Sequence, residues 1–249
     1  MKTEQLIMFA KISQITYDDP KESQKKFKDI GFDIVEFFDV GGAQAYFLKS
    51  TRLNVWSGCV LSFRGTSEKS DIKSDLTSGK NFEINNNGFA VGKIHVGFKH
   101  EINKLWEKIS KSLHDVSNVY ITGHSLGAAM ATIAASRLQT KALSLITFGS
   151  PRVGDKTFVD NLKVPHYRVQ NNCDDVTKVP LYLMGFRHHG THMYMNYYGQ
   201  FRSLTTWQRV KDMIRSRVIA WKKGEHFLGA KDHFMANYIL ALEKPKDEA

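Results

Sequence analysis

The hydrophobic positions of the chain follow two periods, one typical of strands and one typical of helices. Three short runs rich in aromatic and β-branched residues predict a meander of strands. They are FDIVEFF (32–38), AQAYFL (43–48) and CVLSF (59–63). Two helices are predicted before them, up to Ile30, and apolar residues at helical spacing predict another helix over 98–113. The stretch 67–92 before that helix is polar, with a turn at Asn85–Gly88.

The second half of the chain alternates strands and helices. The run VYIT (119–122) predicts a strand, AAMATIAASRL (128–138) a helix and LSLITF (143–148) a further strand. Such alternation implies an α/β protein with a mainly parallel sheet covered on both faces. Because no internal repeat or Pro/Gly/Ser-rich linker interrupts the pattern, we expect a single domain over residues 1–249.

The composition is that of an ordinary globular protein, with 42% hydrophobic and 24% charged residues. No apolar run approaches the roughly 20 residues that cross a bilayer. Glu4 and Gln5 stand where the apolar core of a signal peptide would begin. These features predict a cytoplasmic protein, or one exported without a conventional signal. The two cysteines, Cys59 and Cys173, are expected to stay reduced.

The net charge of +10 is concentrated in the segment 202–224, which contains seven Lys or Arg residues and one Asp. This segment predicts a basic amphipathic helix. Its apolar side is formed by Trp207, Val210, Ile214, Val218 and Trp221. Two interpretations are open: the helix touches anionic lipid or shapes an acyl site, or it packs on the domain with a solvated basic face. No nucleic-acid partner is expected, since no recognised binding motif accompanies the charge.

The motif that carries chemistry is Gly123-His124-Ser125-Leu126-Gly127, which fits G-x-S-x-G between a predicted strand and a predicted helix. A sharp turn there strains the serine backbone and projects its hydroxyl above the sheet edge, while small neighbours let strand and helix approach. Unpaired N–H groups at the start of the helix favour negative charge, which suits an oxyanion beside the N–H of Leu126. Ser125 is therefore the candidate nucleophile.

A serine nucleophile needs a base and an acid, and in α/β hydrolases the acid and then a histidine follow the serine along the chain. Asp174 and Asp175 stand in a polar turn after the predicted strand VPHYRVQ (164–170), and sequence reasoning does not separate them. His233 stands in a loop directly before an apolar helix and is the candidate base. The cluster HHGTH (188–192) has no carboxylate or cysteine at ligand spacing, so packing or surface roles are favoured over a metal site.

The order and spacing of four blocks resemble those of the class 3, fungal-type lipases. The blocks are FRGT (63–66), GHSLG (123–127), DDVTKVP (174–180) and HFMANYI (233–239). The resemblance covers most of the chain and implies an α/β-hydrolase fold, with a central, mostly parallel mixed sheet and helices on both faces. Because the family's acid is typically followed six residues later by proline, Asp174 with Pro180 is the implied acid. Thr66 is the implied second oxyanion donor beside Leu126.

The resemblance also implies a short polar lid at 67–80. Ile72 and Leu76 are its only large apolar residues, so its opening would expose little hydrocarbon and interfacial activation is expected to be weak. Asp75 resembles the family's carboxylate near the lid hinge, where it either braces Thr66 or is a plain charge on a helix face.

The expected activity is hydrolysis of acylglycerols or other lipid esters through an acyl-enzyme on Ser125, with His233 as the base and Asp174 orienting it. No metal or organic cofactor is expected, and the chain is expected to be a monomer whose partner is a lipid or small ester. The alternative is a phospholipase A1 or lysophospholipase on anionic lipids, favoured by the positive surface and the polar lid. A non-catalytic scaffold of the same fold is disfavoured by the intact set of three catalytic residues.

Overall fold

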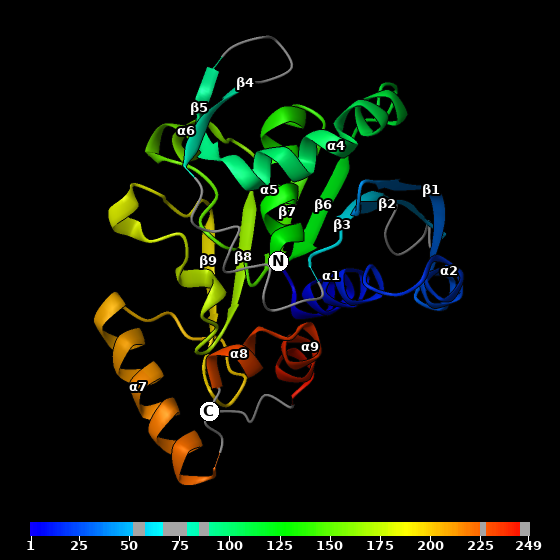
Figure 1. Cartoon of the computed structure of the whole chain (residues 1–249). Helices are drawn as coiled ribbons and strands as arrows, with labels where there is room; N and C mark the ends of the chain where they lie inside the picture. Colours follow the sequence, from blue (N-terminus) through cyan, green and yellow to red (C-terminus); the bar gives the residue numbers. More distant parts are fainter. Residues whose placement is uncertain (52–57, 67–78, 85–89, 225–227, 245–249) are drawn as a thin grey trace.

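A seven-stranded sheet forms the centre of the computed structural model, which describes residues 1–51, 58–66, 79–84, 90–224 and 228–244 (Figure 1). The strands, in their order across the sheet, are β1 (Phe32–Val40), β2 (Ala43–Ser50), β3 (Cys59–Phe63), β6 (Val119–His124), β7 (Ala142–Phe148), β8 (His166–Asn171) and β9 (Thr191–Met195). The pairs β1–β2 and β2–β3 are antiparallel, and all pairs from β3 to β9 are parallel. The predicted mostly parallel mixed sheet is confirmed.

Helices cover both faces of this sheet (Figure 1). The α-helices of the described residues are α1 (Thr3–Ile15), α2 (Pro20–Asp29), α4 (Val96–Ser112), α5 (Leu126–Leu138), α6 (Lys156–Asn161), α7 (Thr206–Lys222), α8 (Leu228–His233) and α9 (Met235–Glu243), of which α7 does not lie on the sheet. Adjacent positions of β3 point to opposite faces: Leu61 packs in the cluster with α4 and α5, and Val60 packs in the cluster with α1 and α9. Because both faces are buried, the central strands are nearly continuous apolar runs.

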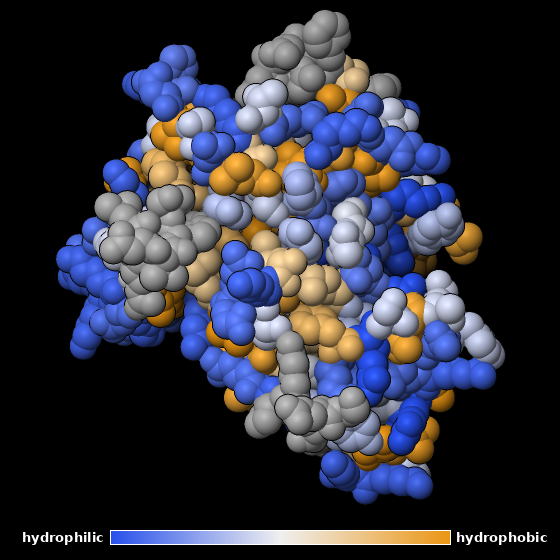
Figure 2. Space-filling model, turned by 180° about the vertical axis from the view of Figure 1, so that it is seen from behind, coloured by the Kyte–Doolittle hydropathy of each residue, from blue (hydrophilic) through white to orange (hydrophobic). Residues whose placement is uncertain are grey.

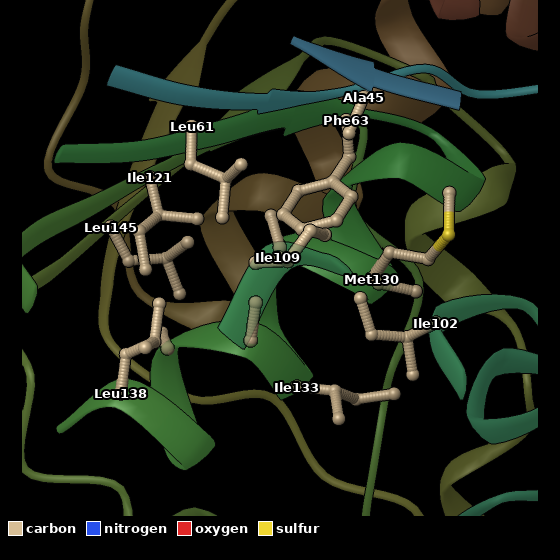
Figure 3. Packing of buried hydrophobic residues seen from close by; sticks show 14 of the residues in the cluster. Ala45, Leu61, Phe63, Ile102, Ile109, Ile121, Met130, Ile133, Leu138 and Leu145 are labelled. Carbon is tan, nitrogen blue, oxygen red and sulfur yellow. The ribbon is translucent and has the colours of Figure 1, made fainter. Parts of the chain in front are cut away.

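The core under α4 and α5 brings the small residues of α5 against the sheet. Figure 3 shows Leu61, Ile121 and Leu145 of three neighbouring strands facing Met130 and Ile133 of α5. Five alanines of α5 are fully buried, namely Ala128, Ala129, Ala131, Ala134 and Ala135. Their small side chains allow α5 to lie close to β6, the strand that leads into it. This close packing fixes the turn between β6 and α5.

A two-stranded antiparallel sheet, β4 (Lys80–Ile84) with β5 (Ala90–His95), lies where sequence analysis identifies only a polar stretch. The strand β4 is not recognisable from the sequence because the charged residue Glu83 stands at one of its buried positions. The carboxylate of Glu83 is 1% exposed and accepts a hydrogen bond from Arg137 Nε at 2.5 Å. A buried carboxylate paired with a cation thus occupies a position where a strand normally has an apolar residue. The predicted turn at Asn85–Gly88 lies outside the described residues.

The region after β8 contains two 3₁₀ turns, η1 (Val176–Lys178) and η2 (Tyr182–Met184), and then the three C-terminal helices. The predicted basic helix within 202–224 is present as α7, which lies at the edge of the molecule, away from the sheet (Figure 1). The prediction that His233 stands in a loop is wrong, because His233 is the last residue of the short helix α8. Among the described residues, no helix is long and apolar enough to cross a membrane.

Candidate active site

Ser125 lies in a sharp turn between β6 and α5, with φ 58° and ψ −127°, a strained conformation for a residue with a side chain. A Cβ atom on Gly123 would overlap the carbonyl oxygen of Gly127, and a Cβ atom on Gly127 would overlap the carbonyl oxygen of Phe63. Both glycines are therefore steric requirements, because they let α5 close against β6 and β3. The Ser125 N–H donates to the carbonyl oxygen of Phe148 at 3.1 Å, which ties the turn to β7.

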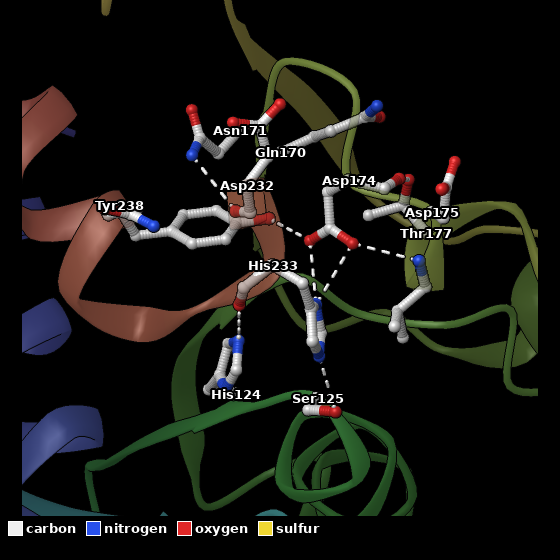
Figure 4. A network of polar contacts seen from close by, with 12 residues as sticks. His124, Ser125, Gln170, Asn171, Asp174, Asp175, Thr177, Asp232, His233 and Tyr238 are labelled. Atoms are coloured by element: carbon white, nitrogen blue, oxygen red, sulfur yellow. Dashed lines mark hydrogen bonds and ion pairs between the residues drawn. The ribbon is translucent and has the colours of Figure 1, made fainter. Parts of the chain in front are cut away.

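Three side chains that are far apart in the sequence meet above this edge of the sheet (Figure 4). His233 Nε2 lies 2.9 Å from Ser125 Oγ, and His233 Nδ1 lies 3.0 Å from each carboxylate oxygen of Asp174. Because a carboxylate only accepts, Nδ1 carries the proton and Nε2 is free to accept the serine proton. Asp175, the other acid that the sequence left open, instead pairs with two basic side chains at the surface.

The carboxylate of Asp174 is fully buried and accepts two further hydrogen bonds. The Tyr238 hydroxyl donates to it at 2.5 Å, and the backbone N–H of Val176 donates at 2.9 Å. Burial raises the pKa of Asp174, but the charge of His233 and the hydrogen bonds from His233 and Tyr238 outweigh burial, so this pKa lies below its ordinary value. The carboxylate stays ionised and stabilises an imidazolium.

Sequence analysis missed Tyr238, because an aromatic residue on the buried side of a helix is usually core. A signal for it exists in the sequence: Tyr238 lies on the helix that directly follows His233, so its side chain returns toward the turn that holds the base.

A second chain of hydrogen bonds holds the backbone of His233. His124 Nε2 lies 2.7 Å from the carbonyl oxygen of His233, and His124 Nδ1 lies 2.8 Å from the hydroxyl of Tyr17 on the other side. Burial and the neighbouring His233 lower the pKa of His124 to about 3, so the ring is neutral. Nε2–H therefore donates to the carbonyl and Nδ1 accepts from Tyr17. His124, predicted only as part of the elbow, thus links the turn after α1 to the base.

Asp232 joins the turn that carries His233 to the turn that carries Asp174. Its carboxylate accepts from Asn172 Nδ2 and from the backbone N–H of Cys173, both at 3.0 Å. Its carbonyl oxygen accepts from Asn171 Nδ2, also at 3.0 Å. Burial raises the pKa of Asp232 to about 6, although these hydrogen bonds act in the opposite direction. Sequence analysis missed this residue, because its partners lie about 60 positions earlier.

The two predicted oxyanion donors lie beyond the same edge of the sheet as Ser125. Leu126 is the first residue of α5, so its N–H is not used by the hydrogen bonds of the helix itself. Thr66 follows β3, and Phe63 at the end of β3 pairs in register with Gly123 of β6. Thr66 therefore lies past the strand ends from which the elbow rises.

The turn before Thr66 packs directly against the elbow. A Cβ atom on Gly65 would overlap the hydroxyl of Tyr17 and the carbonyl oxygen of His124. Only glycine lets the chain pass this close, so the approach of Thr66 to the elbow depends on Gly65.

Two further groups of residues that the sequence singles out remain. The lid residues Ile72, Asp75 and Leu76 lie outside the described residues, so the lid at 67–80 stays a prediction. The histidines of HHGTH (188–192) make separate contacts: His188 with the carbonyl of Thr177 at 2.8 Å, His189 with His166 at 3.1 Å and His192 with Gln170 at 2.9 Å. Across the described part of the chain, no group of three or more His, Cys, Asp or Glu side chains is arranged to hold a metal.

The arrangement has the parts that acyl transfer needs. A hydroxyl on a strained turn faces an imidazole, the imidazole faces an ionised carboxylate, and N–H groups at the start of a helix lie beside the hydroxyl. A neutral base in this tautomer can take the serine proton as the oxygen attacks a carbonyl carbon.

Comparisons with known proteins agree with this geometry. A family model described as lipase (class 3) matches residues 60–184, from β3 through η2. A lipase of Rhizopus niveus is 36% identical over 114 residues, covering 39% of this chain and 29% of that protein. A protein of Arabidopsis thaliana named phospholipase A(1) DAD1, chloroplastic, is 32% identical over 148 residues, covering 49% of this chain and 33% of that protein. The chain thus spans about a third of the length of these curated relatives.

Among solved structures, a Rhizomucor miehei lipase propeptide complex superposes with a TM-score of 0.66 and 22% identity, covering 78% of this chain and 66% of that one. This similarity shows the α/β-hydrolase fold. The family model covers half of the chain, including Ser125 and Asp174, and the chain therefore belongs to the class 3 lipase family.

Proposed function

We propose that this protein hydrolyses carboxylic esters of lipids, acylglycerols first, through an acyl-enzyme on Ser125. The observation that carries the proposal is the unbroken line of hydrogen bonds from Ser125 Oγ through His233 to Asp174, set on a strained turn at the start of a helix. Such a line is the arrangement that turns a weakly nucleophilic hydroxyl into an attacking group. Membership of the lipase family supports a lipid ester as the substrate.

In the proposed mechanism His233 Nε2 takes the proton of Ser125 as Oγ attacks the ester carbonyl carbon. The oxyanion that forms is stabilised by the N–H groups of Leu126 and Thr66. His233 then gives its proton to the departing alcohol oxygen, which leaves the acyl group on Ser125. A water molecule, deprotonated by His233, releases the fatty acid and restores the serine. Asp174 stays ionised throughout and stabilises the charged imidazole.

The second candidate is a phospholipase A1 or lysophospholipase on anionic lipids. It is supported by the net charge of +10 and by the relative that carries that activity in its name. The two candidates share the chemistry at Ser125 and differ in the group on the alcohol side of the ester, so they are separated by substrate preference alone.

A panel of esters tests both candidates: p-nitrophenyl acyls of rising chain length, a monoacylglycerol, a triacylglycerol, phosphatidylglycerol and lysophosphatidylglycerol. We expect the wild type to hydrolyse members of this panel and Ser125→Ala to lose the activity. Ser110→Ala on α4, away from the site, is the matched control. A wild type that neither turns over any ester nor reacts with a fluorophosphonate probe would support the non-catalytic scaffold.

We also propose that residues 1–249 act as one domain and as a monomer that makes peripheral contact with anionic membranes, with the segment 67–80 as its lid and no nucleic acid as a partner. A single sheet shared by both buried clusters supports the single domain. Light scattering of the purified chain tests the monomer. Fractionation of producing cells separates the two predicted locations, cytoplasmic and exported.

A further inference from the structure

Helix α7 turns small residues to the protein and large apolar side chains to solvent. Its two buried residues are Ser216 and Ala220. Four large apolar side chains, which we call the α7 ridge, are exposed: Trp207 by 65%, Ile214 by 58%, Val218 by 48% and Trp221 by 67%. The helix packs on the domain through Ser216 and Ala220, and its basic residues are solvated. Of the five apolar residues that the sequence places on one side of it, only Val210 is half-buried, so the large apolar side chains are not what packs on the domain.

The α7 ridge is a single narrow stripe. Its residues follow one another at spacings of seven, four and three, so at ~100° per residue they project within about 60° of one another. Ser216 and Ala220 lie on the opposite side of the helix. The amphipathic pattern is thus intact, but it is reversed relative to a helix that covers a core.

Polar contacts hold α7 in this orientation. The Tyr194 hydroxyl donates to Asp212 at 2.7 Å, and Cys173 Sγ donates to the carbonyl oxygen of Met213 at 3.4 Å. Ala220 packs with Cys173 and Leu228 in a small buried cluster. Because these contacts all lie on the side opposite the α7 ridge, the helix cannot turn its ridge inward without losing them.

The rim of the α7 ridge is positively charged. Lys211, Arg215 and Lys222 are exposed on one flank and Arg217 is exposed on the other. Lys211 Nζ lies 5.3 Å from the ring centre of Trp207. Asp212 is the one acidic residue of the helix, and it points to the protein. In Figure 2, hydrophobic and strongly hydrophilic residues lie side by side at the lower right, where α7 runs along the edge.

We propose that the α7 ridge is the surface by which this protein binds an anionic lipid membrane. The helix would lie in the plane of the interface, with Trp207 and Trp221 among the headgroups and acyl chains and the basic rim on lipid phosphates. A second copy of the chain is a poor occupant, because its ridge carries the same positive rim and would repel the first. An anionic bilayer supplies both the apolar layer and the opposite charge.

The position of α7 connects this surface to the triad. Arg217 donates to Asp175 at 2.9 Å, and Asp175 is the neighbour of Asp174. The segment after α7 leads into α8, which ends at His233. A membrane bound along the α7 ridge would therefore lie near the two turns that carry the acid and the base. The inference deepens the proposed function, since it names the surface that brings the site to its lipid.

The test uses the Ser125→Ala protein, so that binding is measured without turnover, and vesicles of phosphatidylcholine with or without phosphatidylglycerol. We expect flotation with the anionic vesicles, reduced at least ~10-fold by Trp207→Ser with Trp221→Ser. Lys211→Glu with Arg215→Glu should reduce it as strongly and remove its dependence on salt. The matched control is Val35→Ser with Leu143→Ser, which removes two exposed apolar residues elsewhere and should leave binding unchanged.

Two results would overturn the inference: anionic-vesicle binding that the double tryptophan variant retains, or a dimer in light scattering that this variant abolishes. Tryptophan fluorescence adds a direct check. Brominated lipid should quench the fluorescence of the parent protein but not that of the double variant Trp207→Phe with Trp221→Phe. Hydrolysis of soluble p-nitrophenyl butyrate by proteins with Ser125 intact separates the two proposals. Ridge variants should keep this activity, and its absence in the wild type would count against hydrolysis while leaving the binding result to stand on its own.

Discussion

The elbow at Ser125 and the turn at His233 meet in one site, yet they are held in place by different means. Ser125 is fixed by backbone packed on backbone, because Gly123 and Gly127 bring β6, α5 and β3 into contact. His233 is fixed by hydrogen bonds with residues far away in the sequence, since its carbonyl oxygen accepts from His124 and its Nδ1–H donates to Asp174. The nucleophile is therefore determined by its neighbours along the chain, and the base by its neighbours in space.

The largest loss of stability is expected from a substitution that disturbs the backbone contact between Gly127 and β3. Gly127→Ala should destabilise the fold by about 4 kcal/mol or more, because the new Cβ meets the main chain of β3, which cannot move aside like a flexible side chain. The yield of soluble protein and the thermal unfolding midpoint measure this. Gly79→Ala is the control, since nothing lies within 4 Å of its added Cβ. Equal midpoints for the two variants would mean that the elbow tolerates a wider approach.

On the other side of the comparison, Asp174→Asn should leave the fold intact and remove most of the activity. An amide at this position no longer compels the Nδ1–H tautomer and cannot balance the imidazolium, so kcat should fall on the order of 10⁴-fold. The measurement is kcat on a soluble p-nitrophenyl ester, together with an unfolding curve. Asp175→Asn is the matched control, because its surface ion pairs contribute little. If the two variants lost activity equally, the assignment of the acid would be wrong.

The pH dependence of the free energy of unfolding should report on Asp232, the residue that joins the turn of His233 to the turn of Asp174. The folded-state pKa of Asp232 is raised from 3.8 to about 6, so the folded state favours the protonated form. This group stabilises the fold fully below pH 3.8, loses that contribution as the pH rises through about 6, and is constant above. The total is on the order of 3 kcal/mol, from about two pKa units.

Urea unfolding between pH 4 and pH 8 measures this contribution as the difference between the parent and Asp232→Asn. The amide in that variant would keep an acceptor oxygen toward Asn172 and Cys173 but would not titrate, so the difference should change from pH 4 to about pH 6 and be flat from there to pH 8. A constant difference would mean that Asp232 titrates normally.

Features that depend on neighbours along the chain can be predicted from the sequence, and features that depend on neighbours in space cannot. The strands, the elbow and the basic helix depend on local patterns, and the sequence identifies them. Tyr17, Tyr238 and Asp232 escape prediction because their roles arise only when separate segments meet. The same holds for the α7 ridge: its periodicity predicts a helix, but the side that faces the protein is decided by Tyr194 and Cys173, which lie far from α7 in the sequence or on other elements.

The smallest effect should come from the far end of the chain of hydrogen bonds that holds the base. Tyr17→Phe removes the donor to His124 Nδ1 and leaves that buried acceptor unpaired, which costs about 1–2 kcal/mol of stability. The ring of His124 then has one anchor instead of two, and the carbonyl of His233 follows it. A shift of His233 by a fraction of an ångström should lower kcat on the order of 10-fold while leaving KM unchanged.

Steady-state measurement of kcat and KM on a soluble ester tests this effect. Tyr167→Phe on β8 is the control, because Tyr167 lies outside that chain of hydrogen bonds. A purely structural role for Tyr17 would lower stability alone and leave kcat at the level of the control. The expected split, a fall in kcat without a change in KM, therefore separates a positioning role from a packing role, because only positioning acts on the proton transfer between Ser125 and His233.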